Sequence, residues 1–310
     1  MKKSKLKTYS LSELENWIKK TYKRTPKNKL YLKVANLVRS SNSSERYFSL
    51  PDGEYEIENR EWNASIICPM SIFENKEEMK TVKAKCKMLI ERVTRFPSKL
   101  VFSLMDQSYS PIGTEGFWKY EERWNFETFR FEPKVTINKS GRLIGSDGRP
   151  LFGFHLGSLS EKKPFEKKIY KNILFEDLTE TNLEKAKKLL LKQNLIPLKE
   201  LKKQKFLLVV SPEMGLRAIK IERKLRKERN PDDVLWTPYL KRLNWAVILK
   251  SPSKPLIFQL RTEPDFDVSV FEEFPQKKII ISSYMRCNAG IGDWETIVGS
   301  FKKEVESEIY

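Results

Sequence analysis

The strongest constraint on the fold is a one-sided row of apolar residues that begins near residue 74. These residues recur at the spacing that places side chains on one face of an α-helix, while Lys and Glu fill the positions between them. They are Met79, Val82, Cys86, Leu89, Ile90 and Val93. The pattern predicts a long helix over about 76–95, and such a helix has to lie across a sheet to bury its apolar face.

A shorter helix is predicted near the start of the chain, followed by an extended segment. Ser12 and Glu15 have the spacing of a capping box, and Pro26 is expected to end the helix. The segment 46–75 alternates polar and apolar residues around Asp52-Gly53, which is typical of a β-hairpin with a tight turn. The apolar face of the helix is expected to consist of Leu14, Trp17, Ile18 and Tyr22.

The second half of the chain alternates predicted helices and strands. Thr181 and Glu184 form a second predicted capping box. The apolar run 206–210 is typical of a buried strand, and Ser211-Pro212-Glu213 predicts the start of the next helix. The segment 286–294 is expected to be a turn. Further strands are predicted over 245–249, 255–260 and 279–284, the last two separated by a charged link.

The composition allows a folded core. With 39% hydrophobic residues over 310 positions, the chain can form one large domain or two smaller ones. It contains no apolar run near the ~18 residues of a membrane-spanning helix, and its basic start is not followed by the apolar segment of a secretory signal. Cys68, Cys86 and Cys287 lie far apart without a CxxC pair, which predicts free thiols in a reducing compartment.

The net charge of +18 predicts a polyanionic partner or a strongly hydrated surface. Residues 1–45 contain 12 Lys and Arg against 3 Glu, which indicates a basic N-terminal arm. The basic helix expected over 217–229 also carries Glu222 and Glu228, so a nucleic-acid contact and a hydrated helix face both stay open. The aromatic residues of 118–131 fit either base stacking or packing in a core.

Side chains that carry catalysis are scarce. His155 is the sole histidine, and no nucleophile motif accompanies it, so a structural or surface role is expected. Gly290 and Gly292 lack the third glycine of a dinucleotide-binding motif. We therefore predict no catalytic residue, no cofactor and no resident metal. A group that fits either a hydrated loop or a divalent-ion site consists of Asp265, Asp267, Glu272 and Glu273.

The second half also contains an ordered series of short motifs. Asp147-Gly148 precedes Leu151-Phe152 and His155, and 178–186 has the form L-T-x-x-N-L-x-x-A. The strand 206–210 is followed by a proline and a helix. The last motif consists of Lys254, Pro255, Gln259, Arg261, Pro264, Arg286, Asn288, Gly290, Gly292 and Trp294. This series, over about residues 147–300, resembles the Mu-like phage major head (capsid) protein family.

The resemblance implies the Hong Kong 97-like α+β fold. Such subunits assemble as pentamers and hexamers of an icosahedral shell that encloses double-stranded DNA. The implied setting is a virion capsid formed in the host cytoplasm, with portal, scaffolding and decoration proteins as partners and no membrane. The implied regions are a basic N-terminal arm (1–45), an extended loop or β-hairpin (46–75), a peripheral domain with its spine helix (76–160 and 276–310) and an axial domain (161–275).

The resemblance also implies where contacts form. The extended loop is expected to contact a neighbouring subunit through Arg60, Trp62, Ile66 and Ile67. The residues expected to face DNA are Lys2, Lys3, Lys5, Lys7, Lys19, Lys20, Lys23 and Arg24. Two alternatives stay open, an encapsulin-like shell around a protein cargo and a nucleic-acid-binding protein without sequence preference. A phage and a gene transfer agent are both compatible with the shell.

Overall fold

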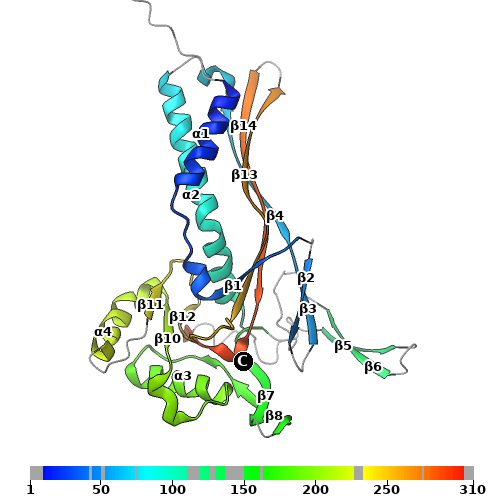
Figure 1. The fold of residues 1–310 in the computed structure, drawn as a ribbon, viewed down its shortest axis with the longest axis vertical. Helices are drawn as coiled ribbons and strands as arrows, with labels where there is room; N and C mark the ends of the chain where they lie inside the picture. The colour runs from blue at the N-terminus through cyan, green and yellow to red at the C-terminus, as the bar shows by residue number, and fades with distance from the viewer. Residues whose placement is uncertain are drawn as a thin grey trace, which may run out of the picture.

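One helix runs through most of the length of the molecule (Figure 1). In the computed structural model this helix, α2, spans Lys76–Gln107, which is about 48 Å at 1.5 Å per residue. Every residue of the predicted apolar stripe is buried, so the predicted helix is confirmed. It continues beyond the predicted end near residue 95, through Pro97, because Val101, Phe102 and Met105 bury a second apolar stretch. The structure describes residues 10–41, 44–49, 53–73, 76–109, 119–125, 130–136, 150–160, 163–226, 233–273 and 276–303.

Helix α1 (Leu11–Arg24) lies beside α2 and contacts the same sheet (Figure 1). Its capping box is formed by Ser10 and Glu13, and the predicted box of Ser12 and Glu15 is wrong. The Ser10 hydroxyl accepts a hydrogen bond from the Glu13 N–H at 3.1 Å, and the Glu13 carboxylate accepts one from the Ser10 N–H at 3.0 Å. The helix therefore begins one residue before the predicted cap. Its buried residues are Leu14, Ile18 and Tyr22.

A four-stranded sheet lies against these helices, in the order β1-β13-β14-β4. Its two long strands, β13 and β14, form an antiparallel hairpin, and β14 pairs antiparallel with β4. The predicted charged link between two short strands is wrong, because its residues belong to β13. Charged and apolar residues alternate there, so Asp265 and Asp267 are exposed while Phe266 and Val268 are buried. The strands are β1 (Ala35–Arg39), β4 (Arg60–Pro69), β13 (Leu256–Glu273) and β14 (Gln276–Ile291).

The predicted turn over 286–294 is also mostly strand. Strand β14 continues to Ile291, and the chain turns only afterwards, where the Gly292 N–H donates to the Pro255 carbonyl at 2.8 Å. A β-carbon on Gly292 would lie 2.4 Å from the Lys254 carbonyl oxygen. The turn therefore needs glycine because two backbone segments approach closely.

A second, five-stranded sheet has the order β11-β10-β12-β15-β9. The prediction of a buried strand over 206–210 is confirmed by β10, in which every residue is buried. Helices α3 (Glu180–Gln193) and α4 (Gly215–Arg226) cover one face of this sheet and pack against it through one apolar cluster. The strands are β9 (Ile173–Leu174), β10 (Phe206–Val210), β11 (Asp233–Trp236), β12 (Leu243–Leu249) and β15 (Ile297–Phe301).

The start of α3 differs from prediction, while Ser211 and Pro212 stand at the N-cap and the first helical position as predicted. Thr179, not Thr181, caps α3, and its hydroxyl accepts a hydrogen bond from the Asn182 N–H at 3.2 Å. A short 3-10 helix, Pro212–Met214, precedes α4, so the Ser211 side chain makes no cap hydrogen bond. For α3, the packing of its apolar face on the sheet fixes the position of the helix, and Thr179 is the polar residue that precedes that position.

The two sheets share one core. The cluster between them contains the C-terminal part of α2, the near ends of β13 and β14, and residues of β10, β12 and β15. Asp106, near the end of α2, joins the halves, because its Oδ1 accepts hydrogen bonds from the backbone N–H groups of Lys241, Arg242 and Leu243, each at 2.8 Å. Asp106 is almost fully buried, and no sequence pattern indicated this role.

Three two-stranded hairpins extend from this framework (Figure 1). The hairpin predicted around Asp52-Gly53 is confirmed by the antiparallel pairing of Ser49 with Gly53, while residues 51–52 lie outside the described part of the chain. The hairpins are β2 (Ser44–Ser49) with β3 (Gly53–Glu58), β5 (Lys119–Asn125) with β6 (Arg130–Thr136), and β7 (Phe154–Ser160) with β8 (Lys163–Lys171). The remaining 3-10 helices are Leu30–Lys33, Met70–Phe73, Leu198–Lys203 and Trp294–Thr296.

The strand pairing divides the molecule differently from the expected regions. A boundary between residues 275 and 276 separates the two paired strands β13 and β14. Strand β15 was expected in the peripheral domain (76–160 and 276–310) but belongs to the five-stranded sheet. Among the described residues, no helix is both long enough and apolar enough to cross a membrane.

Candidate assembly surface

The β2–β3 hairpin is held at its base by three residues, Ile57, Gln259 and Gly290, which we call the hairpin root. Ile57, near the end of β3, is fully buried. The Gln259 amide donates to the Ile57 carbonyl at 3.0 Å. Gly290 leaves the space that the Ile57 side chain fills, since a β-carbon there would lie 2.1 Å from Ile57 Cδ1. Two residues of the predicted C-terminal motif thus position the projecting hairpin.

Two of the four residues expected to contact a neighbouring subunit face the chain's own helices. The Trp62 ring packs on Phe96 of α2 with ring centres 4.7 Å apart, and its Nε1 donates to the Cys287 carbonyl at 3.0 Å. Ile66 packs against the cluster formed by α1, α2 and the long hairpin. Strand β4 pairs along β14 and is not part of the β2–β3 hairpin, so its alternate residues face the helices.

The other two residues face outward. Arg60 is exposed at the start of β4, and the Ile67 side chain is 61% exposed on the sheet face opposite the helices. Ile280 lies opposite Ile67 in the register, and Phe271, 52% exposed, lies on the same face of the neighbouring strand. We call Ile67, Phe271 and Ile280 the sheet patch. Among the described residues, nothing covers it, and such a patch is typical of a protein contact.

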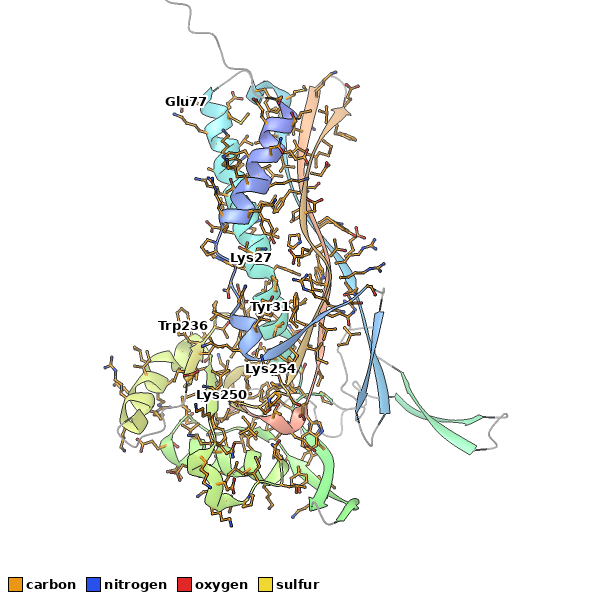
Figure 2. The ribbon with its side chains drawn as sticks, viewed as in Figure 1. Lys27, Tyr31, Glu77, Trp236, Lys250 and Lys254 are labelled. Atoms are coloured by element: carbon orange, nitrogen blue, oxygen red, sulfur yellow. The ribbon has the colours of Figure 1, made fainter. Side chains whose placement is uncertain are left out.

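A second exposed apolar group lies on the five-stranded sheet. Leu216 and Ile219 of α4 are 78% and 37% exposed, and Trp236, on the edge strand β11 next to α4, is 60% exposed (Figure 2). β11 pairs with β10 only, so its other side is an open sheet edge within the described chain. Sequence patterns did not identify these residues, because an apolar residue on an exposed face cannot be distinguished in the sequence from one that faces the core.

The basic residues expected to face DNA are described only in part. Lys2, Lys3, Lys5 and Lys7 lie outside the described residues. Lys19 forms ion pairs with Glu15 at 2.7 Å and with Asp265 at 3.5 Å. Lys20, Lys23 and Arg24 are exposed on α1 and form no ion pair with described residues. α2 adds four exposed basic residues, Lys85, Lys87, Arg92 and Lys99, while its Arg95 forms an ion pair with Glu91 at 3.4 Å.

Several other residues of the C-terminal motif make contacts within the chain. The Lys254 ammonium, near Tyr31 in Figure 2, donates to the Leu32 carbonyl, and burial lowers its pKa. Arg286 forms an ion pair with Glu61 at 3.2 Å. Trp294 stacks on His155. Asn288 accepts a hydrogen bond from the Ala289 N–H at 2.9 Å, while Arg261 is exposed and Pro264 half-buried within β13.

The side chains with reactive groups, His155 and the three cysteines, are buried in the core. His155 is fully buried, with its ring 4.1 Å from that of Trp294 and nearly parallel to it. Cys68, Cys86 and Cys287 are buried free thiols, as predicted. Burial raises the pKa of Cys86 and of Cys287 to about 12. Within the described residues, no group of three or more His, Cys, Asp or Glu is arranged to hold a metal ion.

The acidic group on β13 is distributed along an exposed strand. Asp265 pairs with Lys19, and Glu272 forms an ion pair with Lys277 at 2.6 Å. That ion pair lowers the pKa of Glu272. The side chain of Glu273 lies outside the described residues, and the others face solvent, which favours the hydrated-surface alternative.

Comparison with solved structures defines the fold. No protein-family model and no curated protein matches the sequence. A chain from Mycobacterium phage Patience is similar over 94% of this chain and 87% of its own, with a TM-score of 0.51 and 9% identity. A chain from the procapsid of bacteriophage JBD30 is similar over 96% and 77%, with a TM-score of 0.48 and 14% identity.

A chain from the virus-like particle of Pyrococcus furiosus is similar over 93% of this chain and 98% of its own, with a TM-score of 0.47 and 11% identity. This chain has the Hong Kong 97-like fold of phage capsid subunits. The α+β fold implied by the sequence resemblance is thereby confirmed.

Proposed function

We propose that this chain is a major capsid subunit, of the Mu-like head protein type, that assembles into the pentamers and hexamers of an icosahedral shell. One observation carries the proposal. The long helix α2, the hairpin of β13 and β14, the projecting β2–β3 hairpin and the separate five-stranded sheet together form a capsid-subunit fold over 94% of the chain. Such a subunit acts by shape and needs no catalytic residue.

In this proposal the framework of α1, α2 and the four-stranded sheet is the peripheral domain. The five-stranded sheet with α3 and α4 is the axial domain, and the β2–β3 hairpin is the extended loop. The sheet patch and the apolar group beside β11 are then contacts between copies. Contacts of this kind are heterologous, so each copy uses two different surfaces and the contacts close into rings.

The basic surface of α1 and α2 suits an inner face toward packaged double-stranded DNA. The opposite face of the sheet carries the ion pair of Arg286 with Glu61 at 3.2 Å. On the helical layer Lys19 pairs with Glu15, while Lys20, Lys23 and Arg24 form no ion pair with described residues. Lysines without such partners can neutralise phosphates without reading sequence. The charge distribution therefore favours the helical layer as the side that meets DNA.

The proposed partners and place of assembly follow from the role of a shell subunit. Major capsid subunits assemble with portal, scaffolding and decoration proteins, and we extend this to the present chain, with assembly in the host cytoplasm and a final place in the particle wall. A phage head and a gene transfer agent use the same kind of subunit. An encapsulin-like shell differs in its content, which is protein.

Sedimentation and negative-stain microscopy of the purified chain test the proposal. We expect rings or closed particles of megadalton mass, and nuclease-protected double-stranded DNA inside particles made in cells. Particles that contain protein and no DNA would indicate the encapsulin-like alternative. Monomers that bind DNA with a steep salt dependence, and that never form particles, would refute the shell.

A further inference from the structure

The five-stranded sheet has a different apolar feature at each of its two edges. At the β11 edge, α4 packs on β10 and β11, and the side chains of Leu216 and Trp236 are 78% and 60% exposed. At the other edge, β8 leads into β9, and α3 packs on β12 and β15. A groove of about 770 Å³ lies there, between α3, the chain that follows it and β8. The exposed side chains and the groove therefore lie at opposite edges of one sheet.

The groove has an apolar floor. Leu189, Leu195 and Ile196 line it, and Leu198 at its rim is 59% exposed. Leu195 lies in the left-handed backbone region at φ 56°, so the chain turns directly after α3 and the residues that follow lie beside the helix. The described chain leaves this space open, so its apolar side chains are available to a partner.

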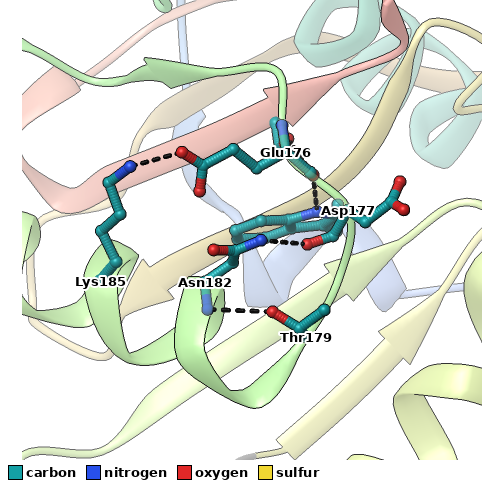
Figure 3. A network of polar contacts seen from close by, with 7 residues as sticks. Glu176, Asp177, Thr179, Asn182 and Lys185 are labelled. Carbon is teal, nitrogen blue, oxygen red and sulfur yellow. Dashed lines mark hydrogen bonds and ion pairs between the residues drawn. The ribbon is translucent and has the colours of Figure 1, made fainter.

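Four lysines form the walls of the groove. Two of them already have a carboxylate partner, since Lys185 pairs with Glu176 (Figure 3) and Lys188 approaches Glu184 at 3.9 Å. The other two, Lys168 of β8 and Lys192 of α3, are exposed and form no ion pair with any described residue. A ligand that depends on many salt bridges therefore gains little here. An aromatic ring suits the groove better, because it can pack on the apolar floor while an ammonium group lies over its face.

Trp236 offers such a ring at the opposite edge. Among the tryptophan side chains in the described part of the chain it is the exposed one, since Trp17 and Trp62 are half-buried and Trp245 and Trp294 are buried. It lies at the end of β11, beside α4 (Figure 2). Indole binds cations more strongly than the other aromatic side chains do, and tryptophan is enriched among the residues that dominate protein contacts.

The Trp236 side chain cannot reach the groove of its own chain. Neighbouring strands lie about 4.8 Å apart, so the two edges of a five-stranded sheet are separated by about 19 Å, which is farther than a side chain extends. A contact between features at opposite edges joins two different surfaces, and repeated copies then close into a ring or continue as a filament. A closed ring is what the proposed pentamers and hexamers require.

We propose that Trp236 of one copy inserts into the groove between α3 and β8 of the next copy. Its ring packs on Leu195 and Leu198, with the Lys192 ammonium over its face, and Leu216 adds apolar contact at the rim. The inference rests on the proposed function, because it names the two surfaces that join neighbouring copies within one ring.

Site-specific photocrosslinking in the full chain tests the contact. Trp236 is replaced by p-benzoylphenylalanine, which keeps an aromatic side chain at this position, in isotopically heavy chains that are mixed with light chains. Peptide mass spectrometry should find the crosslink on residues 189–198 of a different chain. The same group in place of Met88, which is 57% exposed on α2, is the matched control and should not label that segment.

A double-variant cycle measures whether the two surfaces touch. Trp236→Ala should raise the protein concentration needed for half-maximal assembly at least about tenfold. Leu198→Ala should raise it by a smaller factor. If the two side chains meet, the double variant should be little worse than Trp236→Ala alone. Trp236→Phe keeps a ring and should lose less than Trp236→Ala. Circular dichroism checks that each variant is folded.

The outcomes separate this contact from the shell itself. Losses that multiply in the double variant, or crosslinks that map elsewhere while particles form, would overturn the contact and leave the shell intact. Chains that form no particle but crosslink through the groove in small oligomers would refute the shell and support the contact. If neither particles nor crosslinks form at any concentration, both proposals are wrong.

Discussion

Ile57 and Gly290 fit so closely that a β-carbon on residue 290 would lie 2.1 Å from Ile57 Cδ1 and 2.7 Å from Ile57 Cγ1. The contact joins the β2–β3 hairpin to the C-terminal end of β14, one of the two central strands of the four-stranded sheet. The hairpin is therefore held both by the space that Gly290 leaves for Ile57 and by the hydrogen bond from Gln259 to the Ile57 carbonyl.

Gly290→Ala should lower the free energy of unfolding by about 1–3 kcal/mol, because Ile57 has to move out of a filled space. Chemical denaturation of the subunit measures the change. Gly215→Ala is the matched control, since no heavy atom lies within 4 Å of its β-carbon position, and it should be neutral or stabilising by up to about 1 kcal/mol. Ile57→Ala should cost less in the Gly290→Ala background than in the native chain. Equal costs in both backgrounds would contradict the proposed packing.

Asp106→Ala should lower the free energy of unfolding by about 3 kcal/mol, because three backbone N–H groups, one buried and two partly buried, lose their acceptor. Asp106→Asn keeps an acceptor oxygen and should cost clearly less. The denaturant midpoints of the two variants, compared at constant slope, give the difference. Similar small losses for both would show that the carboxylate does not join the two sheets.

The thiols of Cys86 and Cys287 should resist modification in the folded chain. Burial raises the pKa of both to about 12, and the thiolate is the reactive form, so at pH 8 only about one in ten thousand is ionised. Their reaction with a disulfide reagent should become fast only on unfolding. Because the raised pKa favours the protonated thiol, its contribution to stability persists at neutral pH and is lost only as the pH rises toward that value. Ser253→Cys, at an exposed position, provides the reactive control, and native thiols that react as fast would disprove the burial.

Ile67→Asp should prevent particle formation while leaving the subunit folded. Its side chain is already largely in solvent, so the charge costs little until a neighbouring copy covers the sheet patch. Met88→Asp, on the helical side with 57% exposure, is the control and should still give particles. Size-exclusion chromatography and circular dichroism distinguish failed assembly from failed folding. Normal particles from Ile67→Asp would remove the sheet patch from the assembly surface.

Replacing Lys20, Lys23 and Arg24 of α1 by Gln should weaken binding of the chain to double-stranded DNA. The slope of log K against log salt should become shallower by up to about 0.9 for each phosphate that the variant no longer neutralises. The control replaces Lys220, Arg223 and Lys224 of α4 by Gln, which should leave the slope nearly unchanged. If the α4 variant binds DNA more weakly than the α1 variant, the DNA-facing surface lies on the other sheet.

The periodic patterns predicted the main helices and strands, because the spacing of apolar residues reports which face of a single helix or strand is buried. The stripe of α2 and the buried strand β10 are examples, since each has a single environment along one face. The link within β13 failed for a physical reason. Its charged residues are exposed and two register shifts interrupt the alternation, so the segment has the local pattern of a polar link although it is paired throughout the strand.

The contacts that position the candidate surfaces depend on distant parts of the chain. Gln259 meets Ile57 across 202 residues, and Asp106 meets Leu243 across 137. No local pattern marks such pairs. The capping residues failed for the opposite reason, since Ser10 and Ser12 are both suitable caps and packing of α1 on the sheet selected between them.

Pro97 lies where α2 passes from one apolar core to the other, with Val93 in the first and Val101 in the second. A proline has no N–H to offer the preceding turn, so the backbone is one hydrogen bond short at that junction. The ring contact of Trp62 with Phe96 braces the same level of the helix from β4. In a shell whose copies meet at two different angles, α2 would therefore bend most easily at Pro97. The packing of Trp62 on Phe96 would limit that bend, and with it the change in tilt between the two sheets.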